Sequence, residues 1–360
     1  YYRQLLHQQR EVLTSNADID AFRYALQRFP SLARVTITPF AHGLLFTPLY
    51  ETPMIRAFPS GFRYPTPRTW PVNSMYPYGS AYRVEGENWS DLRDSRKNIW
   101  RGFRIVAREL AANPHHRITQ LIIDDCHLFS GINCTIFTEL CAEYHDLVAL
   151  LRSPGFSRLD LALLTVDQWD EYRDALRSGH LRRALAEAPD MQHISLSTCE
   201  TEPNAFLDIY DHEPNDPTFT PLSAIFPVEK WPRLRHFALS SVLVGQDDLL
   251  AFLGTLPATL RSVELVCLGF AQGSYQGLLE GMRASLDWRE RAAGQRPTVT
   301  VGVDADKWRG RIVWATKEVD DFLYGEAPNP FDNPVDKGDM LVKGVGVERD
   351  PFDPEYEGRP

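Results

Sequence analysis

Two aspartates and a histidine form the pattern in this chain that is most typical of catalytic machinery. Asp124 and Asp125 directly follow the apolar stretch QLII, and His127 lies two places further on. Carboxylates and an imidazole at the end of a strand are groups that can hold a metal ion. No glycine-rich loop or second carboxylate cluster accompanies them, so a polar turn that leaves the strand is the favoured interpretation. A hydrolase or metal-dependent enzyme using these three residues stays open as the alternative.

The remaining motifs are weaker signals of chemistry. The acidic stretch DIYDHEPND at 208–216 lacks the alternating order of a calcium loop, and GSYQG at 273–277 misses the nucleophile elbow by one place. Ser274 is better explained as the N-cap of the amphipathic stretch that follows it. Five cysteines occur without a Cys-x-x-Cys pair. We therefore predict no catalytic residues, no metal, no cofactor and no enzymatic activity.

Charge and hydropathy narrow the classes of partner. The net charge of the 360-residue chain is -10, and residues 318–360 hold twelve acids against four bases. The rest is close to neutral and has no basic stripe, which argues against nucleic acid as a ligand. No apolar run approaches 18 residues, so no membrane partner is expected. The odd number of cysteines indicates reduced thiols in an intracellular protein, cytoplasmic or nuclear.

A recurring spacing of apolar residues indicates the fold that must position these side chains. Six segments place apolar residues at the spacing Leu-x-x-Leu-x-Leu, and most follow an amphipathic stretch that ends at a proline. Proline suits this junction because it cannot continue a helix and moves its predecessor out of the helical conformation. The triplets are Leu32, Val35, Ile37; Ile118, Leu121, Ile123; Phe156, Leu159, Leu161; Met191, Ile194, Leu196; Leu234, Phe237, Leu239; and Leu260, Val263, Leu265, with a weaker seventh at Val299, Val301, Val303.

This repeated unit of helix, proline turn and strand predicts an α/β fold. We expect an irregular leucine-rich-repeat-like solenoid, with a curved parallel β-sheet and helices on its convex side. A doubly wound sheet is the alternative. The repeat domain is predicted over 1–316, with an insertion rich in aromatic residues and proline at 39–89, and an acidic C-terminal cap or tail over 317–360. Helix is expected to resume after the insertion, with Ser90 as its N-cap.

Two surfaces are candidates for binding a target protein or peptide. Strand residues that alternate with the apolar ones should face outward on the concave side of the sheet. The second surface is the insertion, because Trp, Tyr and Arg dominate binding hot spots. The predicted concave-face residues are Arg34, Gln120, Arg158, Asp160, His193, Ser195, His236 and Glu264, and those of the insertion are Arg56, Arg63, Arg68, Trp70, Tyr76 and Tyr78.

Several long phrases of the chain occur in one characteristic order. They include DAFRYALQRFPSLARVTITP, WRGFRIVARELAANPHHRITQLIID, FPVEKWPRLRHFALS and GVGVERDPFDPEYE. With these phrases the chain resembles a group of filamentous-fungal F-box proteins, in the region after the F-box. The resemblance covers nearly the whole chain.

The resemblance implies a leucine-rich-repeat-like region that recognises the substrate of an F-box type (SCF) ubiquitin ligase. In such ligases the F-box itself docks on a Skp-type adaptor of a cullin. The F-box pattern, a Leu-Pro-x-Glu opening followed by short amphipathic helices, does not occur in this sequence. Adaptor and cullin are therefore expected as partners only if an F-box precedes Tyr1. A repeat scaffold unrelated to ubiquitin is a further alternative.

Overall fold

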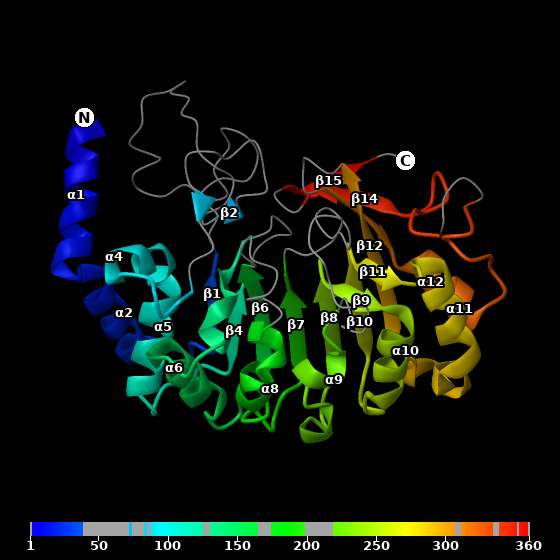
Figure 1. Ribbon diagram of the computed structural model, residues 1–360, viewed down its shortest axis with the longest axis horizontal. Coiled ribbons are helices and arrows are strands. Elements are labelled where there is room, and N and C mark those ends of the chain that lie inside the picture. Colours follow the sequence, from blue (N-terminus) through cyan, green and yellow to red (C-terminus); the bar gives the residue numbers. More distant parts are fainter. Residues whose placement is uncertain are drawn as a thin grey trace, which may run out of the picture.

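Seven parallel strands of the described residues lie side by side in the order in which the chain makes them (Figure 1). The computed structural model describes residues 2–38, 72–73, 83–84, 88–124, 130–164, 174–198, 219–306, 311–333, 338–350 and 353–358. The strands are β1 (Arg34–Ile37), β4 (Gln120–Ile123), β6 (Arg158–Leu164), β7 (His193–Ser197), β8 (His236–Ser240), β10 (Ser262–Val266) and β12 (Thr298–Asp306). The predicted α/β class is confirmed, with a largely parallel central sheet.

The pairing register matches the repeated pattern of the sequence. The middle apolar residues of the first six triplets are direct partners across the sheet, from Val35 to Val263, and Val263 pairs in turn with Val299, the first residue of the weaker seventh triplet. From β4 onward these middle residues are almost completely buried. Burial of one such side chain contributes about 1.5–3 kcal/mol, so this row is a main source of the stability of the sheet.

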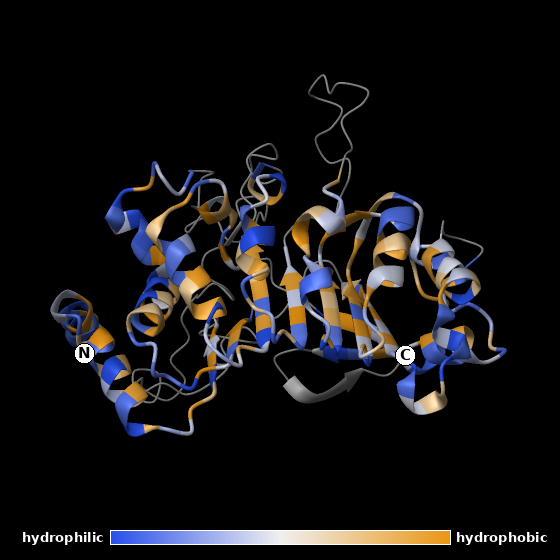
Figure 2. Ribbon diagram, turned by 90° about the horizontal axis from the view of Figure 1, so that it is seen from below, coloured by the Kyte–Doolittle hydropathy of each residue, from blue (hydrophilic) through white to orange (hydrophobic). Residues whose placement is uncertain are grey.

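Helices follow the strands along one side of the sheet (Figure 2). Consecutive members from α5 onward contact one another and pack on the buried strand residues. They are α5 (Arg101–Ala112), α6 (Ala142–Leu151), α8 (His180–Leu185), α9 (Leu222–Ile225), α10 (Gln246–Thr255), α11 (Tyr275–Ser285) and α12 (Lys317–Tyr324). Short 3-10 helices precede or separate them: η1 (Asn98–Trp100) comes before α5, and η2 (Cys134–Phe137), η3 (Val228–Lys230), η4 (Asp287–Glu290) and η5 (Ala293–Gln295) lie between later helices.

The C-terminal part of the chain extends the sheet with antiparallel strands. β13 (Arg311–Ala315) pairs with β12, and β14 (Val347–Asp350) and β15 (Asp353–Gly358) follow outward. α12 packs against β12, and its apolar residues belong to the same core as the parallel strands. Phe331 is completely buried and stacks on Tyr275 with ring centroids 4.9 Å apart. This phenylalanine anchors the chain after α12.

Three short pairings complete the described strands. β5 (Ile132–Asn133) pairs in parallel with the end of β6, while β9 (Leu243–Gly245) pairs with β11 (Gly269–Gln272) and β2 (Val72–Asn73) with β3 (Arg83–Val84). Gly131 precedes β5 at a φ of +152°, and a Cβ at this position would lie 2.4 Å from the carbonyl oxygen of Ala162. Only glycine permits this close approach of two backbones.

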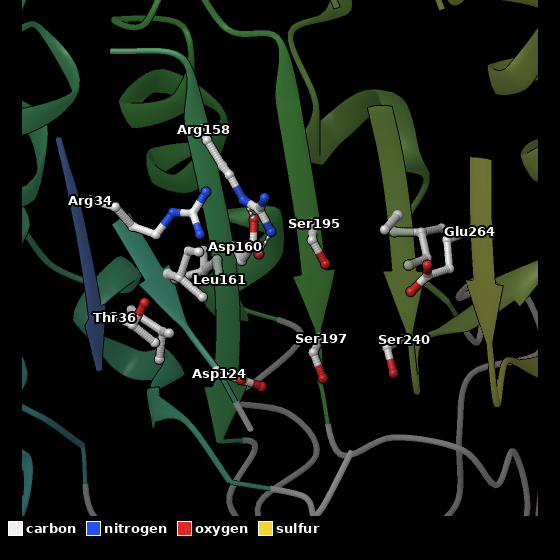
Figure 3. Close-up of a pocket in the computed structure, with 14 residues that line it drawn as sticks. Arg34, Thr36, Asp124, Arg158, Asp160, Leu161, Ser195, Ser197, Ser240 and Glu264 are labelled. Atoms are coloured by element: carbon white, nitrogen blue, oxygen red, sulfur yellow. Dashed lines mark hydrogen bonds and ion pairs between the residues drawn. The ribbon is translucent and has the colours of Figure 1, made fainter. Parts of the chain in front are cut away.

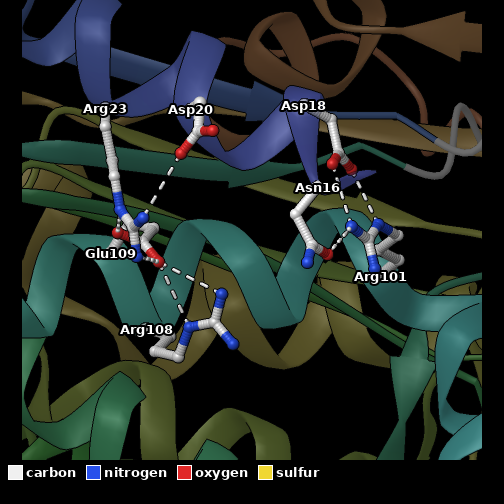
Figure 4. Close-up of polar contacts among 7 residues, drawn as sticks. All are labelled: Asn16, Asp18, Asp20, Arg23, Arg101, Arg108 and Glu109. Carbon is white, nitrogen blue, oxygen red and sulfur yellow. Dashed lines mark hydrogen bonds and ion pairs between the residues drawn. The ribbon is translucent and has the colours of Figure 1, made fainter. Parts of the chain in front are cut away.

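Two ion-pair groups hold the N-terminal helices to the body (Figure 4). α1 (Tyr2–Ser15) contacts α2 (Ala17–Arg28), and α2 lies against α5. Arg101 donates to Asp18 at 2.7 and 2.8 Å, and Arg23 donates to Glu109 at 2.6 and 3.1 Å. Arg108 also bonds Glu109, whose side chain is 7% exposed. Burial alone raises the pKa of Glu109, but the two guanidinium groups outweigh it and the pKa lies below its usual value.

One predicted helix start is wrong and another is confirmed. Helix does not begin at Ser90: α4 (Asp94–Lys97) starts four residues later, because residues 88–92 form a turn around Asn88 that buries Trp89. Trp89, which ends the predicted insertion, donates its indole N–H to Glu143 at 2.9 Å and contacts the ring of Trp100. At the other site, Ser274 Oγ accepts from the N–H of Gly277 at 3.2 Å and caps α11.

Candidate functional site

Side chains that are polar except for Ile122 and Ala238 form two rows across six neighbouring strands. Five of the eight predicted concave-face residues, Arg34, Arg158, Asp160, Ser195 and Glu264, lie on the face opposite the helices (Figure 3). The register pairs each outward residue with its counterpart on the next strand and aligns the other three, Gln120, His193 and His236, with Arg34 and Arg158. The first row is Arg34, Gln120, Arg158, His193, His236 and Ser262. The second row is Thr36, Ile122, Asp160, Ser195, Ala238 and Glu264.

The second row forms much of the floor of a hollow of about 390 Å³, which we call the sheet hollow (Figure 3). Five of the eight predicted concave-face residues line it, namely Arg34, Arg158, Asp160, Ser195 and Glu264. Gln120, His193 and His236 belong to the first row and do not line it. Its lining is mixed: guanidinium groups, carboxylates and hydroxyls alternate with a few aliphatic side chains.

Sequence reasoning missed two hydroxyl groups of the sheet hollow. Ser197 and Ser240 are paired with each other across β7 and β8, two places beyond the second row, and both line the hollow. The alternation that selected the first two rows also selects these serines if it is continued by one step along each strand. Asp124, considered above as a catalytic residue, lies at the end of β4 and lines the same hollow.

Hydrogen bonds link residues of the two rows on strands β1 to β7. Arg34 donates from Nε to the side-chain oxygen of Gln120 at 2.7 Å. Arg158 donates to both oxygens of Asp160, at 3.0 and 2.6 Å, and Asp160 also contacts Nε2 of His193 at 3.0 Å. Burial alone raises the pKa of Asp160, but the bonds to His193 and Arg158 outweigh it and hold the pKa below the usual value. Asp160 is thus a fixed anion at neutral pH.

Two histidine rings are stacked where the first row crosses from β7 to β8. The rings of His193 and His236 are 4.0 Å apart and nearly parallel, and Nδ1 of His236 lies 2.7 Å from Oγ of Ser262. Burial, together with the positive charge that His193 would carry, lowers the pKa of His236 to about 4. His236 is therefore neutral at pH 7, and its ring serves to align the row.

The contacts of this row do not form a nucleophile relay. Ser262 bonds His236, but the carboxylate of Asp160 bonds the other histidine, His193. A Ser-His-Asp relay requires the acid to orient the same imidazole that takes the serine proton. In the parts of the chain that the structure describes, no group of three His, Cys, Asp or Glu side chains is arranged to hold a metal ion. The geometry is suited to binding through charges and hydroxyls.

Some predicted residues lie outside the described part of the chain. These are Asp125 and His127, the acidic stretch at 208–216, and the six residues proposed for the insertion, Arg56, Arg63, Arg68, Trp70, Tyr76 and Tyr78. Of the five cysteines, Cys134, Cys141 and Cys267 are described, and no disulfide bond joins any of these three. Burial raises the pKa of Cys267 to about 12, so that this thiol stays protonated at neutral pH.

No protein-family model matches the chain, and no curated protein sequence matches it. Within the described ranges, no helix has both the length and the apolar composition needed to cross a membrane.

Proposed function

We propose that this chain is a non-enzymatic scaffold that binds a target protein or peptide on the face of its parallel sheet opposite the helices. The observation that carries the proposal is the register: one residue pattern recurs over six neighbouring strands, and its outward positions align into two mostly polar rows. A fold that repeats one unit presents one continuous surface, which is the form that repeat proteins use for binding.

The proposed architecture is the irregular leucine-rich-repeat-like solenoid predicted from the sequence. Two features support it over a doubly wound sheet. The parallel strands follow the chain order without a reversal, whereas a doubly wound sheet reverses its order at the ligand site. The helices contact one another in sequence along one side, which leaves the polar rows uncovered by helix.

The composition of the sheet hollow supports a protein or peptide as the ligand. Small-molecule sites are mostly apolar, with few polar groups. Here Arg34, Arg158, Asp160 and Glu264 bring four charged groups to the same surface as the serine hydroxyls. Mixed charges of this kind give specificity towards a complementary protein surface.

We further propose that the target is a substrate of an F-box type ubiquitin ligase. This part rests on the resemblance of the sequence phrases to fungal F-box proteins, and it requires an F-box that precedes Tyr1. A cytoplasmic or nuclear location is consistent with such a role. The adaptor and the cullin would then bind outside the residues described above.

The test is affinity purification of the full-length protein, with its natural N-terminus, from its host. Two variants are purified beside the wild type: Ser195→Trp, which fills the sheet hollow, and Glu280→Trp, which places the same bulk on exposed residues of α11. We expect Ser195→Trp alone to lose the target. Identical recovery with all three proteins would place binding elsewhere. Recovery of a target without adaptor and cullin would remove the ligase role and leave the scaffold.

Metal analysis of the purified protein tests the enzymatic alternative. Stoichiometric metal that is lost on Asp124→Ala would overturn the proposal of a non-enzymatic scaffold.

A further inference from the structure

Arg34 carries a positive charge that no carboxylate of the described residues neutralises. Its Nε donates to the neutral amide oxygen of Gln120 at 2.7 Å, which fixes the plane of the guanidinium group. The two terminal nitrogens of the group have no hydrogen-bond partner among the described residues, and the residue is exposed. By contrast, Arg101 and Arg152 each bond a carboxylate through two nitrogens. Arg34 is thus positioned by the fold but left available for an anion.

Arg158 points a second guanidinium group toward the same place. Its Nε and one terminal nitrogen bond Asp160, which leaves the other terminal nitrogen for a further acceptor. Gln120 separates the two arginines in the first row. Two strand spacings amount to about 10 Å, a distance that two arginine side chains can bridge through one carboxylate between them. Figure 3 shows both side chains directed over the sheet hollow.

Charge balance selects the type of anion. Arg34, Arg158 and Asp160 together carry one net positive charge, so a single carboxylate neutralises this local cluster, while Asp124 and Glu264 bring the formal charge of the whole hollow to -1. A phosphate group brings nearly two negative charges at pH 7. Its excess charge would face Asp160 directly, and Glu264 and Asp124 also line the hollow. The cluster therefore matches an aspartate or glutamate side chain better than a phosphorylated residue.

We propose that Arg34 and Arg158 form a carboxylate-binding site, which takes an Asp or Glu side chain of the target protein. This inference rests on the proposed function, since it assigns a chemistry to the same face of the sheet. Arg34 supplies two unused terminal nitrogens in a fixed fork, Arg158 supplies one, and the hydroxyl of Ser195 lines the hollow beside them. Gln120 and Asp160 act as positioning residues that hold the two guanidinium planes.

The experiment is a selection from a library of random nine-residue peptides displayed on phage, carried out with the full chain. The proteins are the wild type, Arg34→Gln, Arg34→Lys and the occluding variant Ser195→Trp. We expect the wild type to enrich peptides with Asp or Glu at one position, and Ser195→Trp to enrich none of these. Arg34→Gln should bind a selected peptide at least about tenfold more weakly, since a charge-assisted pair contributes more than a neutral bond. Arg34→Lys should restore part of the affinity, because lysine keeps the charge but not the fork.

A second measurement uses only the wild-type protein and synthetic peptides. One selected peptide is compared with versions that carry Gln, or phosphoserine, in place of its acidic residue. Weaker binding of the Gln version supports the site, while equal binding refutes it. Tighter binding of the phosphoserine version refutes the choice of a carboxylate.

The outcomes separate this inference from the function on which it rests. Peptides that lose binding on Ser195→Trp but show no acidic preference would overturn the carboxylate site and leave the scaffold proposal standing. Peptides that bind the wild type and Ser195→Trp equally would overturn the use of this face altogether, and so would a selection that enriches no peptide.

Discussion

Replacing His236 with glutamine tests whether this buried imidazole of the first row is neutral in the folded protein. His236 lies in the stacked pair with His193, and burial there lowers its pKa to about 4. In the unfolded chain the imidazole has a pKa of about 6.5. Between these two values the unfolded state binds a proton that the folded state does not. The free energy of unfolding must therefore fall as the pH falls from about 6.5 towards about 4.

The size of this effect follows from the two pKa values. One pKa unit corresponds to about 1.4 kcal/mol. Lowering the pH from 7.5 to 5 then costs the wild type about 2 kcal/mol through His236 alone. Glutamine occupies a similar volume and can bond Ser262, but it does not titrate. The difference in stability between the wild type and His236→Gln should shift by that amount, against the wild type, as the pH is lowered.

Urea unfolding followed by circular dichroism at pH 7.5, 6.5, 5.5 and 5 measures this difference. The titratable groups that both proteins share contribute to the pH dependence of both free energies of unfolding. The difference between the two proteins therefore reports on the imidazole of His236. Ser262→Ala is the matched control: it removes the hydroxyl beside Nδ1 but keeps the imidazole. It should lose about 1 kcal/mol at every pH and retain the wild-type slope. A difference between wild type and His236→Gln that stays constant from pH 7.5 to 5 would refute the buried neutral histidine.

Three further substitutions test the packing and the ion pairs, each measured by urea unfolding at pH 7.5. Phe331→Ala should cost about 3–5 kcal/mol because the ring is completely buried, whereas Phe29→Ala, at a ring that is 62% exposed, should cost less than about 1 kcal/mol. Gly131→Ala should cost about 2 kcal/mol or more, since its methyl group meets the backbone of β6; Gly294→Ala, where the Cβ meets open space, should change stability by less than about 0.5 kcal/mol. Glu109→Gln should cost about 1 kcal/mol, and this cost should shrink in 0.5 M salt if the two arginines bind the carboxylate by charge. A small loss of stability for Phe331→Ala would contradict the burial of this ring. Equal losses for the two glycine variants would contradict the close approach of Gly131 to β6. A cost of Glu109→Gln that salt does not change would contradict the ion pairs of Glu109.

The sequence pattern predicted the sheet to the level of individual residue pairs. The triplets align Val35 with Leu121 and Phe237 with Val263, and these residues are paired in the structure. This succeeds because a buried parallel strand needs an apolar residue at every second position, and a one-residue slip would expose all of them. The outward rows follow from the same alternation, which explains why the eight residues predicted for a concave face lie on one surface of the sheet.

Contacts between distant side chains could not be predicted in the same way. Nothing in the local sequence links Arg23 to Glu109, 86 residues apart, or indicates that Asp160 bonds His193 while Ser262 bonds His236. The helix start at Asp94 was missed for a related reason. Burial of Trp89 against Trp100 and Glu143 sets the path of the chain there, and this tertiary constraint overrides the capping preference of Ser90.

The lengths of chain between neighbouring strands predict the order in which the strands form and which strand opens first. β8 and β10 are joined across only 26 residues between His236 and Ser262, whereas β1 and β4 are joined across 86 between Arg34 and Gln120. Closing the longer connection costs about 1 kcal/mol more in chain entropy. β1 is also less buried than the strands that follow it. Folding should therefore nucleate among the central strands and add β1 late, and amide hydrogens of β1 should exchange with solvent by local opening while those of β8 require global unfolding. The guanidinium of Arg34 would then be the part of the sheet hollow that is assembled last.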